Sequence, residues 1–306
     1  MRSILIALII GILHTSLFSQ GGSERKSYKH LVELKHDNDF FTLTDRYYSS
    51  GLFLSYRTVL KKGVFGGNEQ LSLRLGQEVY TPSQTQSVNS ELFDRPYVGY
   101  SGVLGHWSTA GKNTLLNIGI SVGIAGNNSG AGGFQRWYHR AIAIFDSPLW
   151  IDELNNTFHT NLYASYTKEW AWAPNPFGVR AALQPKIAVG SRDIFAETES
   201  IISFGRRNSI GESSAYNRLG QNDQEIYFVL RFAYRHVLYN GLIEGNLFGD
   251  SSGVLKEPET SLILLGFDFN FSIDRSVYKI GIRHNSKETP DADSHAYLEL
   301  SYAFRF

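Results

Sequence analysis

The chain has no cysteine among its 306 residues, which excludes disulfide bonds, zinc–thiolate sites and cysteine nucleophiles. Charged residues make up only 19% of the sequence, below the roughly 25% of typical globular chains. The 29 Lys and Arg residues balance 29 Asp and Glu residues, so there is no basic excess of the kind that binds nucleic acid. Beyond the N-terminus no apolar run approaches the roughly 18 residues of a membrane-spanning helix.

The N-terminus has the pattern of an export signal. Arg2 precedes an apolar run over residues 4–13, and small and polar residues follow. This pattern predicts a secretory signal peptide over residues 1–20, cleaved next to Gln20, and a mature domain over residues 21–306. The alternative is a membrane anchor, for which the run is short. An exported chain without a later spanning helix is either soluble or a closed barrel in an outer membrane.

The dominant hydrophobic period is two residues. Over residues 226–235, apolar side chains such as Phe228, Leu230 and Phe232 alternate with Arg231 and Ala233, and residues 263–271 repeat the pattern. Such alternation indicates strands with one apolar and one wet face, as in a soluble sandwich or a membrane barrel. The second face is often Gly, Ala, Ser or a lone charge, which favours the polar lumen of a transmembrane barrel.

Twelve segments are predicted as strands: 31–39, 51–60, 70–82, 96–107, 113–124, 156–170, 180–192, 195–205, 224–238, 260–273, 276–285 and 295–306. Residues 241–247 are interpreted as a loop. The last segment alternates Leu298, Leu300, Tyr302 and Phe304 and ends on Phe306. Such an ending resembles the recognition signal of outer-membrane barrels, although an ordinary edge strand also alternates. The sequence therefore predicts an all-β fold, a 12-stranded antiparallel transmembrane β-barrel with a short inserted helix near residues 135–147.

Two polar clusters are candidates for chemistry. The first spans residues 36–51 and includes Asn38 and Asp39. Acidic and amide oxygens this close together suit a hard cation such as calcium, although the spacing is not that of an EF-hand and a turn rich in Asx residues is the plainer alternative. This cluster alone does not decide between the two.

The second cluster spans residues 132–139 and continues over 146–150. In a helix, Gln135, His139, Ile142 and Asp146 would share one face. A histidine between an amide and a carboxylate suits a general base. A hydrogen-bonded structural histidine is the alternative.

Taken together, these motifs resemble the lipid A 3′-O-deacylase family of outer-membrane barrels. The resemblance is carried by Asn38-Asp39 and by residues 48–52, 77–82, 94–97 and 135–150, in the family order. It covers residues from about 31 to 155, and the C-terminal half matches only in its strand pattern.

The resemblance implies a site inside the barrel lumen near the outer-leaflet end, and calcium-dependent hydrolysis of the 3′-linked acyl ester of lipid A in lipopolysaccharide. His139 would activate water, Asn38 and Gln135 would position groups, and Asp39 would help to hold Ca²⁺. Ser49 replaces the usual Thr and would act at the metal or the oxyanion through its carbonyl. A monomer in the outer membrane is expected.

One departure from the family concerns Phe145, which stands where the family has a Glu six residues after the histidine. The neighbouring Asp146 is expected to substitute in positioning substrate or oxyanion. Otherwise the chain is a degenerate barrel with a structural or ligand-binding role. A hydrolase of phospholipids or other acylated glycolipids is a further alternative, and a small-solute porin is the least favoured.

Overall fold

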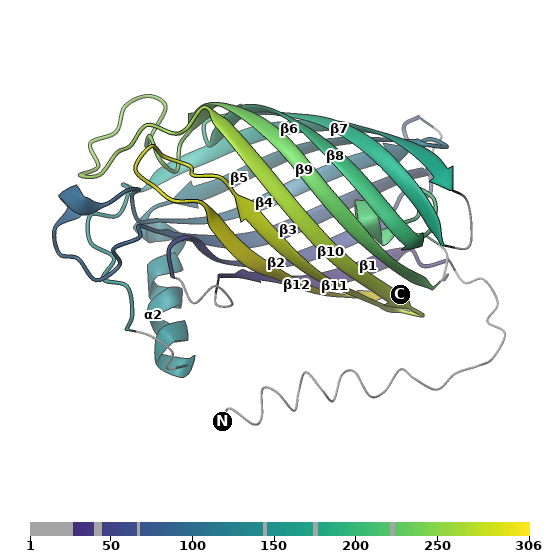
Figure 1. Cartoon of the computed structure of the whole chain (residues 1–306), viewed down its shortest axis with the longest axis horizontal. Helices are drawn as coiled ribbons and strands as arrows, with labels where there is room; N and C mark the ends of the chain where they lie inside the picture. The colour runs from purple at the N-terminus through teal and green to yellow at the C-terminus, as the bar shows by residue number, and fades with distance from the viewer. Residues whose placement is uncertain (1–26, 40–44, 66–67, 143–145, 174–176, 221–223) are drawn as a thin grey trace.

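The computed structural model describes residues 27–39, 45–65, 68–142, 146–173, 177–220 and 224–306. The predicted signal peptide and Phe145 lie outside these residues. Within them, twelve antiparallel strands form one closed barrel, in which each strand pairs with its sequence neighbours and β1 pairs with β12 (Figure 1). The even strand number places the start of β1 and the end of β12 at the same end of the barrel, where Leu31 pairs with Arg305.

The strands are β1 (His30–Asn38), β2 (Tyr47–Val59), β3 (Asn68–Thr81), β4 (Val98–Ala110), β5 (Thr114–Ala125), β6 (Thr157–Ala173), β7 (Gly178–Gly190), β8 (Asp193–Arg206), β9 (Glu225–Asn240), β10 (Ser261–Ile273), β11 (Ser276–Asn285) and β12 (His295–Arg305). The twelve predicted strands and the loop at 241–247 are confirmed. The largest difference is in β2, which begins at Tyr47 rather than at residue 51 because the strand continues through a β-bulge.

The outer surface of the barrel is apolar and the inner surface polar. On β2, Leu52, Leu54 and Tyr56 are 37%, 49% and 40% exposed, and they alternate with the buried Ser55 and Arg57. Because successive side chains of a strand point to opposite faces, the first set faces outward and the second faces the lumen. This apolar outer band is the surface that a transmembrane barrel presents to lipid.

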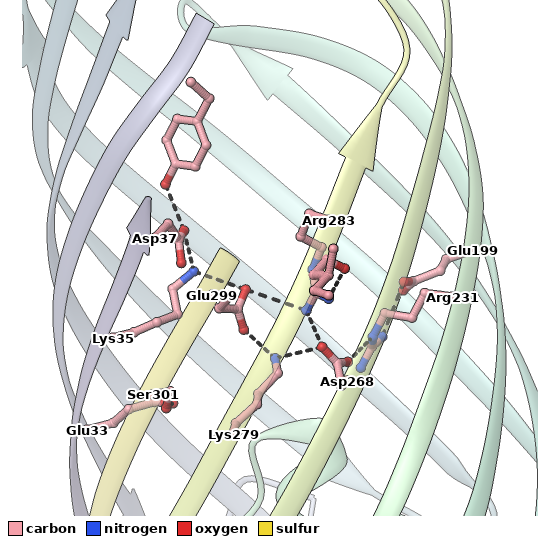
Figure 2. A network of polar contacts seen from close by, with 12 residues as sticks. Glu33, Lys35, Asp37, Glu199, Arg231, Asp268, Lys279, Arg283, Glu299 and Ser301 are labelled. Carbon is pink, nitrogen blue, oxygen red and sulfur yellow. Dashed lines mark hydrogen bonds and ion pairs between the residues drawn. The ribbon is translucent and has the colours of Figure 1, made fainter. Parts of the chain in front are cut away.

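The lumen is crossed by a network of ion pairs (Figure 2). Lys35 Nζ lies 2.8 Å from Asp37 and 3.4 Å from Glu299, whose other oxygen lies 2.5 Å from Lys279 Nζ. The chain of charges then continues to Asp268 and the arginines around it. Cavities of about 410 and 440 Å³ lie between these side chains and their neighbours.

The lumen is covered at the end where the chain terminates. The segment over residues 207–220, with the 3₁₀ turn η4 (Ser214–Tyr216), lines the first cavity together with strand residues. The Gln70 side chain bonds both main-chain groups of Leu219, at 2.7 and 2.9 Å. The Arg218 guanidinium donates to Ser108 and Asn68. This segment therefore packs against lumen-facing side chains of β3 and β4.

Helix α2 (Ala131–Ile142) stands outside the barrel wall, at the end opposite the C-terminus (Figure 1). It begins earlier and ends earlier than the predicted 135–147. It follows the short turn η3 (Asn127–Ser129), where Gly130 has a φ of 73°, and the Ser129 hydroxyl accepts a bond from Ala131 N at 3.2 Å. Among the described residues, no helix is both long and apolar enough to cross a membrane.

The 3₁₀ turn η2 (Ser90–Leu92) lies in the β3–β4 loop.

Candidate active site

Helix α2 packs against the outer face of the barrel wall. On β3, Leu71, Leu73 and Leu75 belong to the outward series and are 42%, 49% and 48% exposed. Val79 and Thr81 continue the same series toward the loop end, yet they are only 1% and 0% exposed. Their burial marks the part of the outer wall that the loop segments and α2 cover, and α2 contacts β3 and β4 directly.

Two further contacts hold α2 in this place. The Ser129 carbonyl accepts bonds from Gln77 Nε2 at 3.0 Å and from the Ser101 hydroxyl at 2.8 Å. At the other end of the helix, the ring of Tyr138 lies 6.2 Å from that of His36 on β1. The wall therefore contacts both the turn before the helix and Tyr138 within it.

The candidate site lies between α2 and the outside of the wall, and the predicted location inside the lumen is wrong. On β1, Asn38 belongs to the series of Val32 and Leu34, which are 39% and 53% exposed to the lipid side, whereas Lys35 and Asp37 face the lumen. The period of two thus places Asn38 on the outer face. The lumen location was implied by the family resemblance, whereas in the structure α2 covers a polar patch on the outer wall.

A bulge in β2 presents Ser49 to this site. Tyr48 pairs with Tyr80 and Ser50 pairs with Val79, so Ser49 has no partner in the ladder. Its carbonyl accepts bonds from Asn38 Nδ2 at 3.2 Å and from Asp39 N at 3.3 Å. Three predicted site residues, Asn38, Asp39 and Ser49, therefore meet at one main-chain oxygen.

Helix α2 brings Gln135 and His139 to a single carboxylate, that of Asp45. Gln135 Nε2 donates to Asp45 Oδ1 at 2.8 Å and lies 3.4 Å from Ser49 Oγ. His139 Nε2 lies 3.1 Å from Asp45 Oδ2. Among the described residues this oxygen is buried without a hydrogen-bond partner, and the imidazole lies within ion-pair distance of it. The predicted shared face of Gln135 and His139 is confirmed.

Sequence reasoning assigned no role to Asp45 or to Trp150, although both stand within the two polar clusters. The Asp45 carbonyl accepts a bond from Thr81 Oγ1 at 2.9 Å, which ties the loop to β3. Trp150 Nε1 donates to Gln135 Oε1 at 2.6 Å. Both ends of the Gln135 amide are thus engaged, one by the indole and the other by the Asp45 carboxylate.

Asp146 does not share a face with His139, because α2 ends at Ile142 and Asp146 follows it as an exposed loop residue. Its main-chain carbonyl accepts a bond from Gln86 Nε2 at 3.4 Å. The place that the sequence suggested for Asp146 beside the imidazole is occupied by Asp45.

The oxygen atoms near Asp39 are of the chemical type that a hard cation binds. Asp39 is 2% exposed, and its Oδ2 accepts a bond from Arg46 N at 3.1 Å. Its carboxylate and the Ser49 carbonyl are both oxygen ligands of the type that calcium takes. Within the described part of the chain, however, no three His, Asp or Glu side chains are placed to hold a metal.

One loop carboxyl next to the site has an altered acidity. Glu153 Oε1 accepts a bond from Gly99 N at 3.4 Å. Burial raises the pKa of Glu153 to about 7, while the Gly99 bond and the charge of Arg136 act in the opposite direction. This carboxyl is therefore partly protonated near neutral pH.

Fold and site together define a transmembrane β-barrel whose candidate site opens on the lipid side of its wall. The chain belongs to the LpxR family: the family model described as "Outer membrane protein LpxR" matches residues 4–306. It is accordingly an outer-membrane protein. A search of curated proteins found no match.

Two solved structures are similar to this chain to different degrees. LpxR from Salmonella typhimurium is 17% identical, with a TM-score of 0.77, over 90% of this chain and 100% of that one. The β-domain of the Bordetella autotransporter BrkA is 10% identical, with a TM-score of 0.48, over 92% of this chain and 100% of that one. The first of these supports the same fold for both chains.

Proposed function

We propose that this protein is a hydrolase that removes the 3′-linked acyl chain of lipid A in the outer leaflet. The observation that carries the proposal is the contact of His139 with Asp45, at 3.1 Å, in a site between α2 and the lipid-facing wall. A base in this place meets a membrane lipid without drawing its acyl chain out of the bilayer. Membership of the LpxR family supports the same class of substrate.

His139 serves as the general base in this proposal. The Asp45 carboxylate lies 3.1 Å from Nε2 of His139, so its negative charge favours the protonated imidazole. In this proposal the imidazole takes a proton from water as the water attacks the ester carbonyl, and the imidazolium then protonates the leaving alcohol. Asp45 stabilises the imidazolium, and such general-base catalysis contributes about 10²–10⁴-fold in rate.

Gln135 and Asn38 act as positioning residues. Gln135 holds the Asp45 carboxylate at 2.8 Å, and Asn38 holds the Ser49 carbonyl at 3.2 Å. Asp39 and the Ser49 carbonyl would hold Ca²⁺, which when bound supplies a positive charge for the oxyanion that develops during ester hydrolysis.

The test uses the purified barrel in mixed micelles with lipid A, and mass spectrometry of the lipid. We expect the wild-type protein with calcium to lower the lipid mass by the 3′-linked chain and His139→Ala to abolish this release. His236→Ala, an exposed histidine of β9 far along the sequence, is the matched control and should retain activity. Lipid A of unchanged mass with the wild-type protein would overturn the proposal.

A second candidate is a non-catalytic barrel of the same family. It is favoured by the position of Asp146 outside the site and by the lack, among the described residues, of a three-residue acidic or histidine cluster. Calcium titration calorimetry separates the two candidates, since an absence of binding favours this one. Incubation with mixed envelope lipids tests for hydrolysis of phospholipids instead.

A further inference from the structure

Helix α2 presents three chemically different faces. Gln135 and His139, one turn apart, form the face toward Asp45. Because an α-helix turns about 100° per residue, Arg136 and Arg140 lie together on the next face round. Phe134 and its aromatic neighbours occupy the other side. The catalytic face of the helix is thus bordered by a basic face and by an aromatic face.

The two arginines are exposed and have no counter-ion in the described part of the chain. Neither guanidinium lies within 4.0 Å of a carboxylate there, and Arg140 Nε donates to the Arg136 carbonyl at 3.2 Å. The charge of Arg136 lowers the pKa of Glu153, but the two side chains do not form an ion pair. Two exposed guanidinium groups one helical turn apart form a site for a phosphate group, which accepts several charge-assisted hydrogen bonds.

The aromatic face has the character of a membrane interface. The ring of Phe134 lies 5.8 Å from that of Trp137 and 6.2 Å from that of Tyr138. Trp137 is 57% exposed, although it is large and apolar. Tyr138 also reaches His36 on the lipid-facing side of β1. Aromatic side chains of this kind gather at the level of lipid headgroups, with their rings toward the acyl region.

We propose that Arg136 and Arg140 bind a phosphate group of the substrate lipid, while the aromatic face of α2 receives its acyl chain. The ester, which lies between headgroup and chain, is thereby placed at His139, between the two faces. This inference rests on the proposed function. It attributes the preference for a phosphorylated lipid to Arg136 and Arg140. The position of both arginines directly after Gln135 and His139 favours the substrate's own phosphate over that of a bulk lipid.

The kinetic test compares lipid A that carries both phosphates with lipid A from which they have been removed enzymatically. For the double variant Arg136→Gln and Arg140→Gln, we expect KM for the phosphorylated lipid to rise about 100-fold, roughly tenfold for each lost arginine contact, with kcat within about twofold. KM for the dephosphorylated lipid should be unchanged. Arg206→Gln, an exposed arginine at the far end of β8, is the matched control. An equal effect on both lipids, or none, overturns the inference.

A binding measurement separates this inference from the proposed function. Calorimetry with the His139→Ala protein measures affinity for the two lipids in micelles whether or not hydrolysis occurs. We expect the two arginine substitutions to weaken binding of phosphorylated lipid A alone. If the wild type releases no chain from either lipid, the proposed function fails and this binding result decides the inference. An equal loss of affinity for phosphatidylglycerol would instead indicate a general membrane anchor and overturn it.

Discussion

At the scale of single residues, the carboxylate beside the imidazole is the feature that only the structure located. The polar cluster over residues 36–51 contains Asp37, Asp39 and Asp45, and nothing in their order indicates which one meets the helix. Asp37 faces the lumen, where Tyr48 donates to it at 2.8 Å, whereas Asp45 reaches Gln135 and His139. The sequence predicted His139 and Gln135 as partners because helical spacing is local, whereas Asp45 comes from a distant loop.

Replacement of Asp45 tests its role in holding the imidazole. We expect Asp45→Asn to lower kcat about 10²–10⁴-fold with little change in KM, because the amide no longer stabilises the imidazolium. Folding should be intact, since the Thr81 bond goes to the main-chain carbonyl of residue 45. Acyl release measured with the purified barrel checks this, and Asp146→Asn serves as the control. Equal losses in both variants would contradict the assignment.

The acidity of Glu153 gives a second prediction at this scale. Burial raises its pKa to about 7, and the Arg136 charge opposes that rise. Arg136→Gln should therefore move the pKa above 7. The pKa of this acid is higher in the folded state than the value of about 4.3 in the unfolded state. The free energy of unfolding therefore falls progressively as the pH rises from about 4.3 to 7. A carbon NMR titration of the Glu153 carboxyl, assigned with Glu153→Gln, measures the shift, and a fall in pKa would refute it.

At the scale of elements, helix α2 depends on a close approach between Gly132 and Trp150. A Cβ at Gly132 would lie 2.9 Å from Trp150 Cδ2, whereas one at Gly133 would meet nothing within 4 Å. The Trp150 indole in turn holds Gln135 at 2.6 Å. The position of the helix and the geometry of the site are thus coupled through one ring.

A pair of alanine substitutions tests this coupling. We expect Gly132→Ala to displace Trp150 and lower acyl release by up to about 10²-fold, since small misplacements of catalytic groups cost that much. Gly133→Ala should leave activity near the wild-type value, because both changes raise helix propensity alike. Turnover of the two purified variants decides the matter, and equal activities would show that the contact is dispensable.

The alternation within strands was readable from the sequence, whereas the bulge at Ser49 was not. The period of two predicted all twelve strands because the lumen and lipid faces differ in polarity along every strand. The bulge shifts the alternation of β2 by one residue, but the adjacent Ser49 and Ser50 are alike in polarity, so the shift does not show in the apolar–polar pattern. The predicted start of the helix was also wrong: Gly132 and Gly133 are poor helix formers, so their propensity gave no sign that α2 begins at Ala131.

At the scale of the whole molecule, the lumen network links β1 and the strands from β9 to β12 through ion pairs. Asp268 is fully buried and lies 2.6 Å from Arg283, 2.9 Å from Arg231 and 3.9 Å from Lys279 (Figure 2). Removal of one partner from a buried charge cluster leaves the others without compensation, at a cost of about 3–5 kcal/mol.

Substitution of this aspartate should therefore lower stability without a direct effect on the site. We expect Asp268→Ala to reduce the free energy of unfolding by about 3–5 kcal/mol, measured by urea unfolding in lipid vesicles. Asn270→Ala, a buried neutral change on the same face of β10, should cost less than half as much. An unchanged midpoint for the aspartate variant would contradict the role assigned to the network.

The sequence by itself determined the barrel, its strand number and its two polar clusters, because the alternation of apolar and polar residues is a local property of each strand. The tertiary structure decided that these clusters meet outside the wall rather than within the lumen. That outcome depends on where the β5–β6 loop folds back and on which loop carboxylate it meets. Both are long-range contacts between segments far apart in the chain, and no local pattern encodes them.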